Sequence, residues 1–164
     1  MKHGQIMGMP LILLFGLIVA AMILAFGIRY GLQLMDQGNY VAAVQAIGDI
    51  EANVQPFQNY DEGSGKTYPL EFPDAVETVC FYDPAMPQQC IADGGACSAE
   101  LEDTLALVLD SQYNVYLFPE GVFDRTRFGI QAFSTDEGNP VCASNGNEIL
   151  FTTHRDTVGI GYYA

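Results

Sequence analysis

The hydrophobic pattern of this sequence begins with an unbroken apolar segment near the N-terminus. Twenty-five consecutive residues, Gly4 to Ile28, carry no charge. With a rise of about 1.5 Å per residue, a helix of this length exceeds the ~30 Å hydrocarbon core of a bilayer. A secretory signal peptide is an alternative, but its leader would be only MKHG and no small-residue cleavage site follows closely. The pattern predicts a transmembrane span at about residues 6–28.

Helical periodicity continues beyond Arg29. We assign residues 5–55 to one long helical segment, which is clearest from about Pro10 to Asn53, and expect Pro56 to end it. The apolar stripe of its second half should pack against a sheet of the domain that follows. That stripe comprises Leu34, Met35, Val41, Val44, Ile47 and Val54.

A β-rich pattern follows the polar loop at residues 58–66. Short runs of β-branched and aromatic residues, bounded by Pro, Gly, Asp or Asn, predict strands, the last two forming a hairpin. These strands are expected at residues 67–72, 75–82, 114–118, 127–133, 148–153 and 157–163. One helix interrupts them at Ser98–Asp110, with Ser98 as N-cap and Leu101, Leu105 and Val108 along one face. The fold class is therefore α+β: a long N-terminal helix followed by a mostly antiparallel β-domain at residues 58–164 with one short helix.

Negative charge is confined to the part of the chain beyond the apolar segment. All twenty acidic residues lie at or after Asp36, and six basic residues leave a net charge of −14. Such a surface cannot neutralise phosphates, so we expect no nucleic-acid partner. Only Lys2 and Lys66 are lysines. Few lysines and many acids are typical of halophilic proteins, although an ordinary acidic ectodomain is the alternative.

Four cysteines, Cys80, Cys90, Cys97 and Cys142, all follow the span. Their even number favours disulfides and an extracellular domain, with the N-terminus in the cytoplasm; four reduced thiols are the alternative. Spacings of nine, six and forty-four intervening residues lack the C-x₂₋₄-C pairs of zinc sites. Of three possible pairings, a local Cys90–Cys97 loop and a bridge between the strand-like runs at Cys80 and Cys142 fit the sequence naturally.

Small residues recur four positions apart in the apolar segment and just beyond it. Such spacing places them on one helix face and allows helices to approach closely in lipid, although it also arises by chance in sequences rich in Gly and Ala. The pairs are Gly16 with Ala20, Ala21 with Ala25, and Gly27 with Gly31. They indicate self-association, or association with similar subunits, through this helix.

The sequence contains few residues of the kinds that catalyse reactions. The only histidines are His3 and His154, and we interpret His154 and Asp156 as residues of a solvated hairpin turn rather than a metal pair. Asp61-Glu62-Gly63 lacks the alternating acids of a calcium loop. We therefore expect no enzyme activity, cofactor, metal or small-molecule substrate.

The N-terminal sequence MKHGQIMGMPLILLFGLIV resembles archaeal type IV pilin-like proteins with class III signal peptides. It is most similar to functionally uncharacterised archaeal membrane proteins that begin K-x-G-Q-I-M-G-M-P. Weaker similarity occurs at Pro73 together with residues 79–81, at residues 115–119 and at residues 139–142. The resemblance implies a pilin-like fold and cleavage by a dedicated peptidase between Gly4 and Gln5. It also favours pairing Cys80 with Cys142, because these two cysteines often stand alone in such relatives.

Two positions depart from the pilin pattern. Met9 stands where pilins usually carry a glutamate that neutralises the N-terminal amine of a neighbouring subunit, and Met7 stands where class III prepilins favour serine. We therefore weigh two functions. The first is a pilin-like structural subunit that is anchored by, or assembled into a filament through, its hydrophobic helix. The alternative is a single-pass, membrane-anchored ectodomain that acts as a binding or adhesion module without polymerising.

Overall fold

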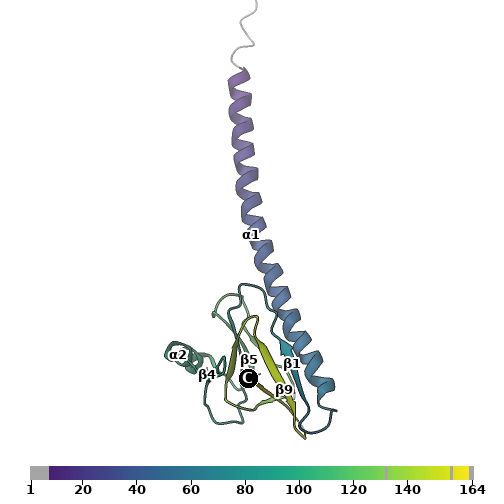
Figure 1. The fold of residues 1–164 in the computed structure, drawn as a ribbon. Coiled ribbons are helices and arrows are strands. Elements are labelled where there is room, and N and C mark those ends of the chain that lie inside the picture. The colour runs from purple at the N-terminus through teal and green to yellow at the C-terminus, as the bar shows by residue number, and fades with distance from the viewer. Residues whose placement is uncertain (1–7, 132, 156, 163–164) are drawn as a thin grey trace, which may run out of the picture. The chain divides into compact units, whose positions relative to one another are not determined.

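The structure, a computed structural model, describes residues 8–131, 133–155 and 157–162. The chain forms two compact units, residues 1–38 and residues 39–164. Helix α1, Gly8–Phe57, contributes to both units (Figure 1). The β-domain is therefore built from the last turns of α1 together with everything that follows it.

The C-terminal part of α1 is a structural element of the β-domain core. Its buried stripe is Ala43, Ile47, Ile50, Val54 and Phe57, spaced three or four residues apart. The sequence correctly predicts that this half packs on the domain but places the stripe partly on the wrong face. Val41 is 62% exposed and Val44 is 39% exposed, because these side chains point away from the sheets.

The end of α1 also differs from the prediction. Pro56 lies inside the helix, which continues to Phe57. A proline so close to the end removes one late hydrogen bond, and burial of the Phe57 ring in the core holds the last turn in place. The helix therefore ends at Phe57, one residue after Pro56, and not before the proline as the sequence predicts.

The strands described in the β-domain form two sheets. The four-stranded sheet has the order β1-β9-β10-β7, and the six-stranded sheet has the order β4-β3-β8-β2-β5-β6. The bounds are β1 Gly65–Pro69, β2 Thr78–Phe81, β3 Ile91–Ala92, β4 Gly95–Ala96, β5 Val115–Phe118, β6 Arg127–Phe128, β7 Phe133–Thr135, β8 Val141–Ser144, β9 Glu148–Thr153 and β10 Val158–Tyr162. Most pairs are antiparallel, but β10 pairs with β7, and β3 with β8, in parallel.

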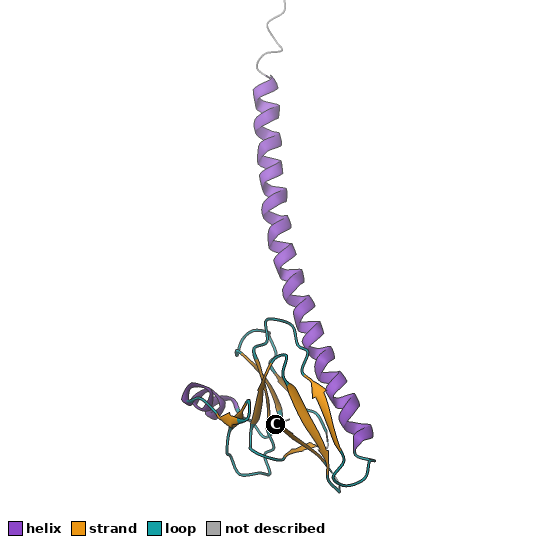
Figure 2. Ribbon diagram, viewed as in Figure 1, coloured by secondary structure: helices purple, strands orange, loops and turns teal. Residues whose placement is uncertain are grey.

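Successive side chains along the central strands point to opposite faces of the six-stranded sheet, and so contribute to two hydrophobic clusters. On one face of the six-stranded sheet, residues such as Val79, Leu117 and Ala143 join the main core with α1 and the four-stranded sheet. On the opposite face, Cys80, Tyr116, Phe118 and Cys142 form a second cluster with helix α2, Ala99–Val108. Figure 2 shows α2 and the C-terminal part of α1 on opposite sides of the strands. Strand β5 is buried at every position, which explains its uninterrupted hydrophobic sequence.

Helix α2 forms where the sequence predicts it. The Ser98 side chain accepts a hydrogen bond from the Leu101 backbone N–H, and Glu100 and Glu102 occupy the first turn, where the helix dipole favours negative charge. Leu105 and Val108 are buried against the six-stranded sheet.

The predicted strand at 127–133 is wrong. Residues 127–128 form β6 in one sheet and residues 133–135 belong to β7 in the other. Strands β3 and β4 are two residues each, too short to give a periodic signal. They form because β4 pairs with β3 and β3 pairs with β8. The predicted hairpin at the C-terminus is present as β9 and β10.

Candidate assembly helix and disulfide face

The N-terminal part of α1 is the first candidate functional surface. Every side chain from Ile12 to Gly38 is exposed within the described chain. Among the described residues, α1 is the one helix long and apolar enough to cross a membrane. Monomeric soluble proteins rarely expose an apolar surface of this extent, and such surfaces commonly mark sites of protein or membrane interaction.

The predicted small residues lie open on this helix. No atom comes within 4 Å of a Cβ built at Gly16, Gly27 or Gly31, and Ala20, Ala21 and Ala25 are exposed. At about 100° per residue, Gly16, Ala20, Gly27 and Gly31 share one narrow face of the helix. The same rotation places Ala21 and Ala25 on a different face. The proposed cleavage position, Gly4 and Gln5, lies outside the described residues.

The structure joins Cys80 to Cys142 and Cys90 to Cys97. Cys80 and Cys142 are directly opposed on the antiparallel strands β2 and β8, and both are completely buried under α2. Cys90 and Cys97 precede β3 and follow β4, so their bond closes the base of this short hairpin. Both disulfides therefore lie at the face of the six-stranded sheet that α2 covers.

Asp93 fastens the β3–β4 hairpin to β8. The residue adopts a positive φ of 46° in the turn, and its carboxylate accepts hydrogen bonds from the Ser144 N–H at 2.9 Å, the Ser144 hydroxyl at 2.6 Å and the Asn147 amide at 2.8 Å. Partial burial opposes ionisation of the carboxyl, but these hydrogen bonds outweigh it and lower the pKa of Asp93. The Tyr162 hydroxyl accepts a hydrogen bond from the Asp93 N–H, and burial raises the pKa of this tyrosine. Sequence reasoning missed this site, although Asp-Gly-Gly at 93–95 is a turn signal.

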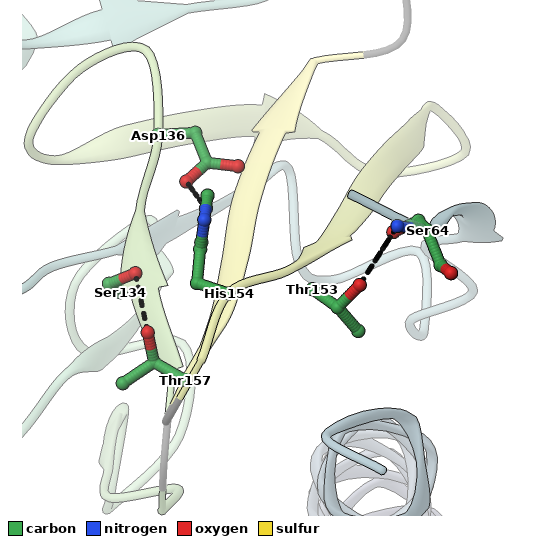
Figure 3. Close-up of polar contacts among 6 residues, drawn as sticks. All are labelled: Ser64, Ser134, Asp136, Thr153, His154 and Thr157. Atoms are coloured by element: carbon green, nitrogen blue, oxygen red, sulfur yellow. Dashed lines mark hydrogen bonds and ion pairs between the residues drawn. The ribbon is translucent and has the colours of Figure 1, made fainter. Parts of the chain in front are cut away.

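A second polar site lies on the outer surface of the four-stranded sheet (Figure 3). His154 Nε2 lies 2.7 Å from Asp136 Oδ1, and the His154 side chain is 45% exposed. Ser134 lies in the neighbouring strand β7, and its hydroxyl is 3.4 Å from the Thr157 hydroxyl. Among the described residues, His154 is therefore hydrogen-bonded to Asp136 and not to Ser134. The residue that meets His154 is Asp136, eighteen positions away; Asp156, its neighbour in sequence, lies outside the described residues.

The Asp136 carboxylate sits directly over Gly159 of β10. A Cβ built at Gly159 would overlap both carboxylate oxygens of Asp136, whereas one built at Gly161 would meet its nearest side-chain atoms at 3.7 Å, an ordinary contact. The alternation of glycines in β10 thus leaves room for the segment after β7 to fold back over this strand.

Replacing Gly159 with alanine should therefore destabilise the domain by about 1–3 kcal/mol, because Asp136 must move and lose its contact with His154. Gly161→Ala is the matched control, since it makes the same chemical change in the same strand without overlap. Urea unfolding of both variants measures the effect on stability, and the NMR chemical shifts of the His154 ring report whether Asp136 has moved. Equal stability of the two variants would show that the close approach of Asp136 to Gly159 has no energetic role.

A third feature is a cavity of about 610 Å³ between α2 and the β3–β4 hairpin. Its lining includes Cys90, Gly95, Leu105, Leu109 and Asn139. The buried Asn139 side chain is fully engaged: it accepts a hydrogen bond from the Asp83 N–H and donates to the carbonyls of Asp83 and Met86. The asparagine therefore fixes the wall of the cavity rather than offering a free polar group to a ligand.

No protein-family model matches this chain, nor does any curated protein or solved structure.

Proposed function

We propose that this protein is a pilin-like cell-surface subunit, anchored in the membrane by, or assembled through, its N-terminal hydrophobic helix. The N-terminus faces the cytoplasm and the β-domain faces outward. The protein works by assembly or contact and performs no catalysis. The N-terminal resemblance supports an archaeal source, and the acidic composition suits a high-salt environment, where screening by salt weakens repulsion between acidic surfaces.

The observation that carries this proposal is the continuity of α1. One uninterrupted helix contains both the exposed apolar segment and the turns that bury Ile50, Val54 and Phe57 in the domain core. A removable signal sequence would not need to continue helically into the core of the mature domain. A permanent anchor stays covalently joined to the domain, and here the apolar segment and the buried turns belong to the same helix. The N-terminal resemblance to pilin-like proteins supports the same interpretation.

Two separate small-residue faces support assembly. A helix that packs in a filament or membrane bundle contacts neighbours on more than one side, and small residues permit close backbone approach at each contact. The face with Gly16 and Ala20 and the face with Ala21 and Ala25 provide two such surfaces.

Met9 favours the alternative function. Without a glutamate at this position, the chain lacks the carboxylate that neutralises a neighbouring N-terminal amine in pilins. A single-pass ectodomain that binds another surface protein needs no such neutralisation. The two functions share the anchor and the topology and differ in whether the helix leaves the membrane in a filament.

The test is expression of the full-length chain, with a C-terminal tag, in an archaeal host that has a prepilin peptidase. The subunit proposal expects Gln5 as the N-terminal residue of the protein, tagged chain in sheared filaments, and digestion of the domain by protease added to intact cells. A Gly4→Val variant should remain uncut and absent from the filaments. Tagged chain that stays only in the membrane fraction would support the anchored module, and protection of the domain from external protease would overturn both.

A further inference from the structure

We propose that the Cys90–Cys97 pair is an internal exchange site, through which small thiols and disulfides make and break the buried Cys80–Cys142 bond. The proposal starts from the position of the sulfur atoms. The Sγ atoms of Cys90, Cys97 and Cys142 all lie within 4.8 Å of one another. Because Cys142 is bonded to Cys80, one disulfide lies directly beside the other.

The backbone fixes this proximity. Strand β3 runs parallel to β8 with Ala92 opposite Cys142, and Cys142 is opposite Cys80 on β2. The Asp93 N–H donates a hydrogen bond to the Cys142 carbonyl at 3.0 Å, and the Asp93 carboxylate holds Ser144 two residues farther along β8. The hairpin that carries Cys90 and Cys97 is therefore tied to Cys142 by both main-chain and side-chain hydrogen bonds.

The two disulfides differ in how easily a small molecule can reach them from solvent. Cys80 and Cys142 have no exposed surface and lie in the cluster under α2. Cys90 is only partly buried and lines the cavity of about 610 Å³ between α2 and the hairpin. A small thiol or disulfide that enters this cavity meets Cys90 before it can meet Cys142. Exchange requires direct contact between sulfur atoms, so access determines which bond reacts first.

The reducing sequence is balanced in electrons and protons. An external dithiol reduces Cys90–Cys97 and leaves as a cyclic disulfide. One thiolate of this outer pair attacks Cys142 Sγ, a new S–S bond forms, and Cys80 departs as a thiolate that takes up a proton. The second thiol of the outer pair then attacks the mixed disulfide, which restores Cys90–Cys97 and releases Cys142 as a thiol. The net result is transfer of two electrons and two protons from the dithiol to the buried pair.

The oxidising sequence is the reverse. An external disulfide accepts two electrons from the outer pair and departs as two thiols, and the Cys90–Cys97 bond formed then oxidises Cys80 and Cys142 by the same exchange. A second external disulfide restores Cys90–Cys97. Two external disulfides are thus consumed for the two bonds made, and no external molecule needs to reach the buried sulfurs.

The first experiment compares rates of reduction in the full-length oxidised protein in detergent micelles. Dithiothreitol is added under native conditions, samples are quenched with acid and alkylated, and peptide mapping follows the Cys80–Cys142 bond. In a Cys90→Ser/Cys97→Ser variant, this bond should be lost at least about tenfold more slowly, because the intramolecular attacking thiol is gone. Gly95→Ala is the control, since it alters the same hairpin at an ordinary contact distance and keeps both pairs. An equal or faster loss in the double variant overturns the proposal.

Slower loss of the Cys80–Cys142 bond in the double variant would distinguish exchange through the outer pair from a simple change in stability. Loss of the outer disulfide destabilises the fold, and destabilisation alone would speed reduction of the buried bond through unfolding. A second measurement avoids mutation: the outer pair of the wild type is reduced briefly, capped with N-ethylmaleimide, and the protein is then treated with dithiothreitol. Capped protein should retain Cys80–Cys142 at least about tenfold longer than uncapped protein. Equal loss in the capped and uncapped proteins would rule out the outer pair as the route.

Discussion

Replacing Gly16 and Ala20 together with leucine should abolish association of the protein through α1. Both positions are exposed on one helix face, and nothing lies within 4 Å of a Cβ at Gly16. In lipid, helices associate through close backbone contact, which two leucine side chains would prevent. We expect wild-type oligomers in mild detergent to become monomers, with a loss of filament incorporation in cells. Crosslinking and analytical ultracentrifugation measure the first result, and shearing of cells measures the second.

Two matched variants sharpen this prediction. Ile18→Leu with Met22→Leu changes two exposed positions on the opposite side of the same helix, beside Ala25, and should leave association intact because both substitutions nearly conserve side-chain volume. Ala21→Leu with Ala25→Leu tests the second small-residue face. If the wild type is monomeric and the Gly16→Leu/Ala20→Leu protein functions equally well, association through this helix is wrong. Membrane anchoring alone would then remain.

Removal of the buried disulfide should produce the largest loss of stability in the β-domain. On the chain-entropy model, the Cys80–Cys142 bond, with a sequence separation of 62, stabilises the fold by about 4 kcal/mol. The Cys90–Cys97 bond, with a separation of 7, contributes about 2.5 kcal/mol. Cys80→Ala with Cys142→Ala also removes sulfur atoms from a fully buried cluster, which adds a cavity term to the loss.

Urea unfolding of the full-length protein in detergent measures both losses, with Cys90→Ala/Cys97→Ala as the comparison. The order of stability should be wild type, then the variant without the local bond, then the variant without the buried bond. Equal losses, or the reverse order, would mean that the unfolded chain is not restrained by the longer loop as the entropy model requires.

Local sequence determined the elements whose stabilising contacts are also local. The uncharged segment and the 3.6-residue period of α1 depend on residues a few positions apart. Helix α2 begins at Ser98 because a hydroxyl can bond to a backbone N–H three residues later. The C-terminal hairpin joins neighbouring strands, and β5 is recognisable because both of its faces are buried. In each case the sequence pattern that identifies the element lies within a short window, even where burial by distant residues stabilises it.

The tertiary structure alone decided the contacts between distant residues. Residues 127–133 have one continuous β pattern, yet their two ends pair with different partners, β5 and β10. The buried face of α1 turned toward Ala43 and Ile50 rather than Val41 and Val44, because the sheets, and not the hydrophobicity of single residues, set the rotation of the helix. Asp136 contacts His154, 18 positions away, and Asp93 hydrogen-bonds to Ser144, 51 positions away. Polar contacts of this kind leave no periodic trace in a sequence, since they depend on strand order and register that form only when the whole domain packs.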